Sequence, residues 1–229
     1  MVVAAIFAAG EGSRVGAATP KQFLPLGGKP MLLRCAESFI SHPQVDYVVI
    51  LCSAAWLTHT KNMFMPCSKL RVTVGGEDRI GTLEAALAFC GKLACGAEDI
   101  LLTHDAARPF VSERIITENI DAARKYAVCG TYLPCADSLV RGREGFAAET
   151  IARDGVYRAQ TPQSFRIGAL TAGLSRLGSE EKSALTDACG LFTALGERVK
   201  IIQGESVNFK ITTAEDLALA KLLAGGSGE

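Results

Sequence analysis

The chain has 229 residues, of which 48% are hydrophobic and 21% are charged, and its 24 lysines and arginines balance its 24 aspartates and glutamates. This length and composition are typical of a folded globular protein and exclude a disordered chain. The balanced charge, without a dense run of lysine or arginine, argues against a nucleic-acid partner.

The chain shows no sign of a membrane or secretory segment. Its N-terminal apolar run is too short for a signal peptide, and no apolar stretch approaches the ~18 residues of a membrane span. Its eight cysteines include no C-x-x-C pair and lie mostly in apolar stretches, so we expect reduced, buried thiols rather than disulfides or zinc ligands. We therefore expect a cytoplasmic protein without a membrane partner.

Apolar, β-branched runs alternate with helical patterns along the chain. The expected strands are Val2–Phe7, Tyr47–Leu51, Leu70–Val74, Ile100–Thr103, Gly130–Pro134, Val199–Gln203 and Phe209–Thr212. The expected helices are Pro30–Ser41, Ile80–Cys90, Ser112–Tyr126, Ile167–Leu177, Ala184–Leu195 and Thr213–Leu223. This order predicts a single α/β domain over residues 1–229 with a mostly parallel sheet, which binds ligands at the carboxyl ends of its strands.

Residues 136–160 interrupt the alternation of strands and helices. They are polar and contain two glycine turns, GREG and RDG, which predict a β-hairpin that projects from the main sheet. A projecting hairpin gains little stability by itself, so we interpret it as a dimer-forming element. A flexible surface loop is the alternative.

The first candidate site is AAGEGSRVGAATPKQF, residues 8–23, directly after the first strand. Val15 stands where the dinucleotide-binding fingerprint needs its third glycine, and Val15 with Gly16–Ala17 also fails the Walker A pattern. What remains is a glycine-rich turn from which Arg14 and Lys21 project, and this pairing suits a triphosphate. An ordinary turn with solvated cations is the alternative.

Two further loops follow expected strands. In GGEDRIGT (75–82), adjacent glycines let the backbone approach a flat ring, with the Thr82 hydroxyl near its edge. In THDAARPF (103–110), Asp105 and Arg108 form either a pair that holds substrate hydroxyls or magnesium, or a structural ion pair.

Other charged and polar residues are scattered in the sequence. Arg153, Thr161 and Lys210 stand at loop or strand ends, where a second anion site could form. The three histidines show no metal-ligand spacing, so a histidine metal site is not expected.

Six motifs, in order along the chain, resemble those of the cytidylyltransferase family that makes CDP-activated polyols. They are AAGEGSRVG…PKQF, GGEDR, HDAARPF, TPQSF, LTDAC and NFKITT, and the resemblance runs from about residue 2 to residue 222. It implies a Rossmann-like nucleotidyltransferase domain of the GT-A type, with a β-arm at about 134–160 that reaches into the second subunit of a homodimer. The implied reaction transfers CMP from CTP to a sugar-alcohol phosphate and releases pyrophosphate, with Mg²⁺ bound together with CTP.

The resemblance also assigns roles to individual residues. The CTP phosphates and ribose would be held by Ala8, Ala9, Gly10, Arg14 and Lys21, and the cytidine by Gly76, Glu77 and Thr82. Asp105 and Arg108 would hold the acceptor hydroxyls. The acceptor phosphate would be held by Ser138, Arg153 and Thr161, supplied by the arm, together with Lys210. Arg14, Lys21 and Lys210 would surround the α-phosphorus and carry the catalysis, and Asp105 is a candidate metal ligand.

The motifs bear on which sugar-alcohol phosphate is used. Glu77–Asp78, Thr82 and Ser138 differ from the usual residues of the methylerythritol-phosphate enzymes, whereas GEDR, THDA-x-RPF, QTPQSF and LTDAC look more like the ribitol-phosphate branch. Ribitol 5-phosphate is therefore favoured, and 2-C-methyl-D-erythritol 4-phosphate, of non-mevalonate isoprenoid biosynthesis, is the alternative. A nicotinamide oxidoreductase lacks its acidic ribose anchor here, and a non-catalytic nucleotide binder would not need such a gathering of cations.

Overall fold

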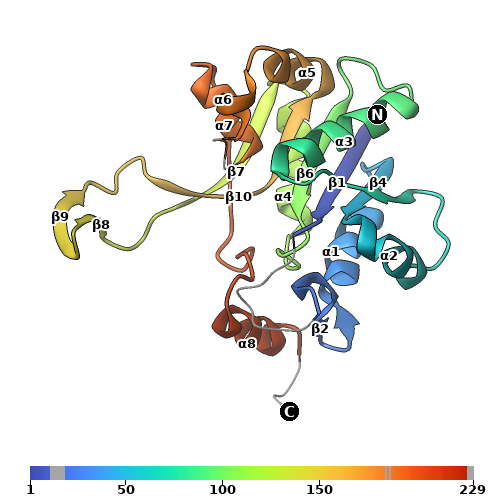
Figure 1. Cartoon of the computed structure of the whole chain (residues 1–229), viewed down its shortest axis with the longest axis horizontal. Coiled ribbons are helices and arrows are strands. Elements are labelled where there is room, and N and C mark those ends of the chain that lie inside the picture. The colour runs from blue at the N-terminus through green and yellow to red at the C-terminus, as the bar shows by residue number, and fades with distance from the viewer. Residues whose placement is uncertain (11–18, 184, 186, 226–229) are drawn as a thin grey trace.

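The central feature of the computed structural model, which describes residues 1–10, 19–183, 185 and 187–225, is a seven-stranded sheet. Its strands are β1 (Val2–Ala8), β4 (Tyr47–Cys52), β5 (Leu70–Val74), β6 (Ile100–Asp105), β7 (Val128–Pro134), β10 (Tyr157–Arg166) and β11 (Lys200–Gln203). They lie in the order β11-β7-β10-β6-β1-β4-β5 (Figure 1). Four neighbouring pairs run parallel, and β10 alone runs antiparallel to its neighbours, β6 and β7. The α/β fold with a mostly parallel sheet is confirmed.

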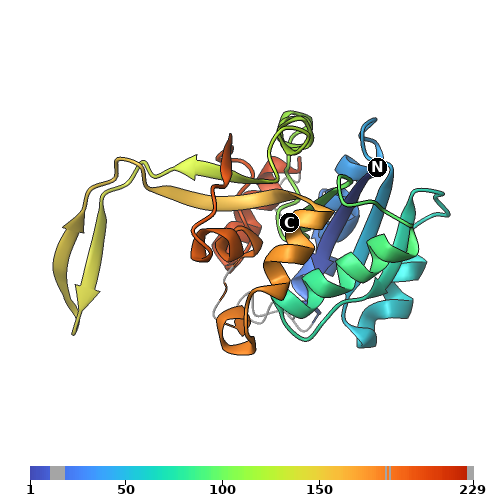
Figure 2. The ribbon, with the colours of Figure 1, turned by 90° about the horizontal axis from the view of Figure 1, so that it is seen from above.

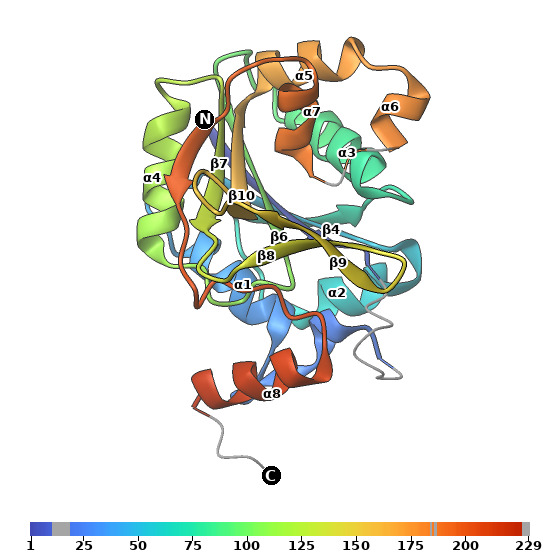
Figure 3. The same ribbon diagram turned by 90° about the vertical axis from the view of Figure 1, so that its left-hand side faces the viewer.

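Helices cover both faces of this sheet (Figures 2 and 3). The helices are α1 (Met31–Ile40), α2 (Leu57–Met63), α3 (Arg79–Lys92), α4 (Glu113–Ala123), α5 (Ile167–Ser175), α6 (Ser179–Ser183), α7 (Ala188–Ala194) and α8 (Ala214–Leu223). Strand β1 shows why two layers form, because Val2, Ala4 and Ile6 pack with α1 and α4 while Val3 and Ala5 pack with α3, α5 and α7. Both faces of a central strand are buried, so its sequence is continuously apolar.

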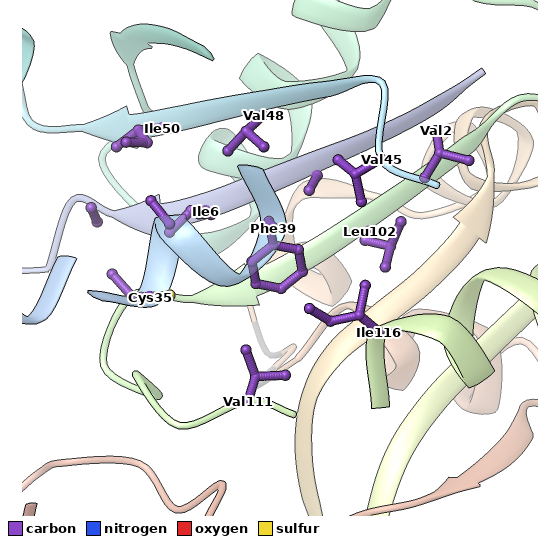
Figure 4. Close-up of a cluster of buried hydrophobic side chains, with 14 of the residues drawn as sticks. Val2, Ile6, Cys35, Phe39, Val45, Val48, Ile50, Leu102, Val111 and Ile116 are labelled. Carbon is purple, nitrogen blue, oxygen red and sulfur yellow. The ribbon is translucent and has the colours of Figure 1, made fainter. Parts of the chain in front are cut away.

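The larger core lies between the sheet and helices α1 and α4. Phe39 of α1 is fully buried there and sits among Val45, Leu102 and Ile116 (Figure 4). Because α1 presents its apolar residues on one side only, the helix is held against the ends of β1 and β4. This packing helps to fix β1, whose carboxyl end borders the cavity described below.

Helix starts are set by short polar side chains. Asp78 caps α3 by accepting a 2.6 Å hydrogen bond from the Gly81 N–H, and Asp187 caps α7 in the same way. Ser112 caps α4, and Thr213 begins α8 with a capping box. Such caps satisfy backbone donors that a helix leaves unpaired, so they help to determine where these four helices begin.

Strand β10 is the main element that the sequence analysis missed. Its sequence YRAQTPQSFR is polar and contains a proline, and its register with β7 shifts between Gln160 and Gln163. The buried polar groups are hydrogen bonded: Ser164 Oγ donates to the Asn119 side-chain oxygen at 3.0 Å, and Gln160 Nε2 donates to the Glu205 carbonyl at 2.8 Å. Tertiary hydrogen bonds therefore stabilise a strand that hydrophobicity does not reveal.

Other differences are smaller. The expected strand Phe209–Thr212 is wrong, because this segment has no regular secondary structure, although Ile211 donates its N–H to the Ala107 carbonyl at 2.9 Å. Short helices α2 and α6 were not expected, and neither was the pairing of β2 (Pro25–Leu26) with β3 (Lys29–Pro30). The helix expected at Ala184–Leu195 is α7, and Ala184 and Thr186 lie outside the described residues.

Strands β7 and β10 continue into an antiparallel hairpin formed by β8 (Leu139–Arg143) and β9 (Phe146–Ile151). The hairpin extends away from the sheet and the helices (Figures 1 and 2). Its turn uses Glu144 and Gly145 with φ of 54° and 85°, a pair of left-handed conformations that suits a tight hairpin. Val140 and Phe146 on this hairpin are exposed.

The C-terminal helix α8 packs on a separate small cluster, in which Ala220 meets Leu26, Met31 and Ile211. This contact brings the segment before α8 beside the loop after β6. None of the helices in the described ranges is long and apolar enough to cross a lipid bilayer.

Candidate functional site

A cavity of about 340 Å³ lies at the carboxyl ends of β1, β5 and β6. The end of β1 and the residues directly after it contribute Ala8, Ala9 and Gly10, and Lys21 follows from the next segment. The loop after β5 and the start of α3 contribute Gly76, Glu77 and Thr82, while Asp105 and Lys210 complete the predicted residues that line it. The edge of the sheet at which ligands were expected is therefore hollow and charged.

Asp105 is the centre of the charge network in this cavity. Its Oδ1 lies 2.8 Å from Arg79 Nη1, and its Oδ2 lies 2.9 Å from Lys210 Nζ. Arg108 Nε is farther away, at 3.8 Å from Oδ2. One buried carboxylate therefore faces three cations, which come from α3, from the loop after β6 and from the C-terminal segment.

The ionisation of Asp105 follows from these contacts. Burial by itself disfavours the charged carboxylate, but the positive charges of Arg79, Lys210 and Arg108 outweigh it and hold the pKa of Asp105 well below its usual range. Asp105 is therefore an anion at neutral pH. The cluster nevertheless carries a net positive charge, because three cations face one anion.

Arg108 and Thr161 lie beneath the cavity rather than in its lining. Arg108 is buried, and its Nη1 and Nη2 donate to the carbonyls of Asn208 at 2.9 Å and Ala159 at 3.2 Å. The Thr161 hydroxyl is also buried and accepts a 3.1 Å hydrogen bond from the Asp105 N–H. Both side chains therefore tie the loop of Asp105 to neighbouring segments.

His104 completes the network around Thr161. Its Nε2 lies 3.0 Å from the Arg108 carbonyl, which can only accept, so Nε2 carries the proton. Its Nδ1, 3.0 Å from the Thr161 hydroxyl, therefore accepts from that hydroxyl. Burial lowers the pKa of His104 to about 4, so the ring is neutral at physiological pH.

The loop after β1 is held by a side chain from the KQF segment. Gln22 is buried, and its Nε2 donates to the carbonyls of Ala8 at 2.8 Å and Gly10 at 3.1 Å. Lys21, its neighbour, donates from Nζ to the Ile211 carbonyl at 2.8 Å. The segment that follows the glycine-rich stretch thus fixes both that loop and the chain next to Lys210.

The loop after β5 has a structural reason for its second glycine. A Cβ at Gly76 would lie 2.3 Å from the carbonyl carbon of Gly81, so only glycine fits against the first turn of α3. The Thr82 hydroxyl donates to the Asp78 carbonyl at 2.8 Å and accepts from the Gly76 N–H at 3.2 Å. These contacts shape the wall of the cavity in which Glu77 stands.

The remaining predicted residues lie elsewhere. Ser138 and Arg153 are exposed on the projecting arm, where Arg153 Nη1 donates to the Ala136 carbonyl at 2.9 Å. They are not brought to the cavity of their own chain. Arg14 lies outside the described residues.

Three residues of the site carry no predicted role: Arg79, Gln22 and His104. Arg79 stands in the quoted motif GGEDR, Gln22 in PKQF and His104 in THDAARPF. For Arg79, the position of an arginine at the start of a helix, directly after a glycine loop, is a sequence signal that could have indicated a role in the site. Gln22 and His104 form hydrogen bonds with backbone carbonyls and a hydroxyl, and contacts of this kind cannot be predicted from the sequence.

The carboxylates that line the cavity belong to Glu77, Asp78 and Asp105. The described ranges contain no group of three or more histidine, cysteine or acidic side chains arranged to hold a metal ion. Magnesium does not require such a cage, because it keeps several waters and commonly binds one or two carboxylates together with substrate phosphates. Asp105 and Glu77 fit that mode if a triphosphate occupies the cavity.

Comparison with known proteins gives consistent matches over nearly the whole chain. The family model described as IspD, 2-C-methyl-D-erythritol 4-phosphate cytidylyltransferase, matches residues 2–225. A ribitol-5-phosphate cytidylyltransferase of Lactiplantibacillus plantarum is 37% identical in an alignment 228 residues long that covers 97% of this chain and 98% of that protein.

Solved structures agree with these sequence matches. A crystal structure of 4-diphosphocytidyl-2C-methyl-D-erythritol synthase is 29% identical, with a TM-score of 0.81 over 97% of this chain and 98% of that one. A 2-C-methyl-D-erythritol 4-phosphate cytidylyltransferase of Francisella tularensis is 27% identical, with a TM-score of 0.81 over 96% and 98% of the two chains.

Proposed function

The chain belongs to the IspD family of cytidylyltransferases, whose substrates are CTP and a sugar-alcohol phosphate, and on that premise we propose that its acceptor is ribitol 5-phosphate. The observation that carries this choice is the 37% identity to a ribitol-5-phosphate cytidylyltransferase over 97% of the chain. The solved methylerythritol enzymes named above are 29% and 27% identical. The product would be CDP-ribitol, with pyrophosphate released.

The proposed transfer of CMP does not require a side chain that acts as a general base. The nucleophile is an oxygen of the acceptor phosphate, which is already ionised at neutral pH, so no general base is needed. The difficulty is that one anion must approach the α-phosphorus of another, in line with the departing pyrophosphate. Positioning and charge neutralisation therefore supply most of the rate enhancement.

The charges of the cavity suit this task. Lys21 and Lys210 both line it, and Asp105 holds Lys210 in place. We assign these two lysines, together with Arg14, to the α-phosphoryl group. Ala8, Ala9 and Gly10 would meet the phosphates and ribose through their backbone, because Gln22 fixes that loop.

The nucleoside is assigned to the loop after β5. Glu77 and Gly76 line the cavity, and Thr82 shapes their loop through its hydrogen bonds. Asp105 would meet the acceptor hydroxyls, with Arg108 and Thr161 holding its loop from below.

Magnesium is expected to arrive with CTP, and Asp105, which lines the same cavity as Glu77, is the carboxylate we assign to it. When bound, the ion would neutralise part of the phosphate charge.

The arm of residues 134–160 is proposed to join two subunits. Its exposed Val140 and Phe146 offer apolar surface, and Ser138 and Arg153 on the arm would then grip the acceptor phosphate in the site of a second copy. Sedimentation velocity should show a dimer that a Val140→Asp/Phe146→Asp double variant dissociates. A monomeric wild-type protein would remove this part of the proposal.

The decisive experiment is an assay of pyrophosphate release with CTP, Mg²⁺ and one acceptor at a time. We expect turnover with ribitol 5-phosphate and at most weak turnover with 2-C-methyl-D-erythritol 4-phosphate. The opposite preference would assign the chain to the methylerythritol reaction named by its family model. Omitting Mg²⁺, or adding a chelator, should abolish turnover with either acceptor.

A further inference from the structure

Arg79 occupies a fixed position at the edge of the cavity. It is the first residue of α3, directly after the Asp78 cap, and the contact of Gly76 with Gly81 leaves this loop little freedom. Its guanidinium carbon lies 5.6 Å from the centre of the Phe7 ring, at the end of β1. The side chain is therefore held between β1 and β6.

Only part of the hydrogen-bonding capacity of this guanidinium is used. Nη1 donates to Asp105 Oδ1 at 2.8 Å, and no other hydrogen bond of the group is recorded among the described residues. Nε is buried and has no hydrogen-bond partner within the part of the chain that the structure describes. The side chain is 23% exposed and lines the cavity, so the group can still meet a ligand.

The charge around Arg79 indicates the kind of ligand. Asp105 faces Arg79, Arg108 and Lys210, and Lys21 also lines the cavity, so the local cations exceed the one carboxylate they share. Glu77 and Asp78 also line the cavity, yet the four cations still outnumber the three carboxylates, and a further anion would balance them. The planar fork of an arginine matches the oxygens of a phosphate, which accept two parallel hydrogen bonds.

From this geometry we infer that Arg79 is an additional nucleotide-binding residue, which keeps Asp105 in place through Nη1 and donates from the rest of its guanidinium to a phosphate oxygen of CTP. The inference rests on the proposed function, since it takes CTP as the ligand. It adds a contact from the start of α3 to the cations that were assigned to the triphosphate.

The test is calorimetric binding of CTP, and separately of cytidine, to the full-length protein in the presence of Mg²⁺. We expect Arg79→Met to raise the Kd for CTP by about 10- to 100-fold, the range of a hydrogen bond to a charged group. The Kd for cytidine, which has no phosphates, should change by less than about 3-fold. Arg79→Lys, which keeps the charge and loses the fork, should lie between the wild type and Arg79→Met.

Arg124→Met is the matched control, because Arg124 lies at the end of α4 and pairs with Asp121 on the surface. It should bind CTP like the wild type. An equal loss of CTP and cytidine binding in Arg79→Met would assign the residue to the nucleoside, and unchanged CTP binding would leave it a positioning residue for Asp105; either result overturns the inference. If Arg79→Met does not fold, Arg79→Lys decides by the same comparison.

The inference and the proposed acceptor fail in different ways. If the wild type binds CTP but does not turn over ribitol 5-phosphate, the acceptor is wrong while the binding test of Arg79 still applies. If the acceptor is right and CTP binding does not depend on Arg79, only the inference fails.

Discussion

Lys210 Nζ lies 2.9 Å from Asp105 Oδ2, although the two residues come from distant parts of the chain. The contact joins the irregular segment before α8 to the carboxyl end of β6. It fixes the position of a lysine ammonium at the edge of the cavity.

Replacing either lysine of the cavity should impair turnover far more than folding. Lys21→Ala or Lys210→Ala is expected to lower kcat by about 10²–10³-fold, the usual effect of removing one preorganised group that stabilises developing charge. The melting temperature should fall by only a few degrees, because the Lys210 side chain is 37% exposed and the buried Asp105 carboxylate keeps its contacts with Arg79 and Arg108. Lys92→Ala, at the exposed end of α3, is the control; near-normal turnover in both cavity variants would contradict the assignment.

Removing the arginine of the arm should affect one substrate only. Arg153→Ala is expected to raise KM for the acceptor at least tenfold, because one charge-assisted hydrogen bond to its phosphate is lost, while KM for CTP changes little. Arg141→Ala is the matched control, since Arg141 lies on the same arm and pairs with Glu149 in solvent. Steady-state kinetics with each substrate varied in turn decides, and equal losses for both substrates would remove Arg153 from its proposed role.

His104 should make stability depend on pH. Its folded pKa of about 4 lies below the ordinary value near 6.5, so the unfolded chain binds a proton more readily than the folded one. The stabilisation is complete above about pH 6.5 and is lost as the pH falls toward 4, by roughly 3 kcal/mol at most.

Urea unfolding at pH 7 and pH 4.5 measures this effect, with His104→Asn as the comparison. The asparagine oxygen replaces Nδ1 as an acceptor for Thr161 and does not titrate. The fall in unfolding free energy between the two pH values should therefore be smaller in the variant. The same fall in both proteins would show that His104 does not contribute.

The glycine loop after β5 should not tolerate a side chain. Gly76→Ala is expected to lower the unfolding free energy by about 1–3 kcal/mol and to weaken CTP binding, because its Cβ would lie 2.3 Å from the Gly81 carbonyl carbon. Gly91 lies in helix α3 itself, and a Cβ added there has nothing within 4 Å. Gly91→Ala should therefore be neutral or stabilising by up to about 1 kcal/mol. Chemical denaturation of both variants gives the comparison; equal effects would rule out the steric explanation.

The sequence predicted the elements in which local pattern and burial agree. The continuous apolar runs of β1 and β4 and the motif at Asp105 led directly to the sheet and to one wall of the cavity. Strand β10 was not visible, because most of its buried side chains are polar and form hydrogen bonds only with distant partners such as Asn119. For the same reason, burial of the Thr161 hydroxyl against His104 and the Asp105 N–H could not be read from spacing.

The expected pairing of Asp105 with Arg108 was only partly informative. The two charged groups do approach, at 3.8 Å, but the closer partners of Asp105 are Arg79 and Lys210. Both are brought in by tertiary packing: Arg79 by the cap and glycine contact at the start of α3, and Lys210 by the packing of Ile211 with α8. The spacing of residues within one motif cannot predict that side chains from distant segments approach the same carboxylate.

The register of β7 with β10 has a consequence for protein engineering. Pro134 and Tyr157 face each other where the paired strands leave the sheet, and everything between them forms the stem and tip of the hairpin. A short turn that links these two positions would excise the appendage and leave the TPQSF half of β10, with Thr161, in register beside β6. The fold thus divides into an α/β body that contains the cavity and a projecting hairpin, and a single cross-strand pair marks the boundary between them.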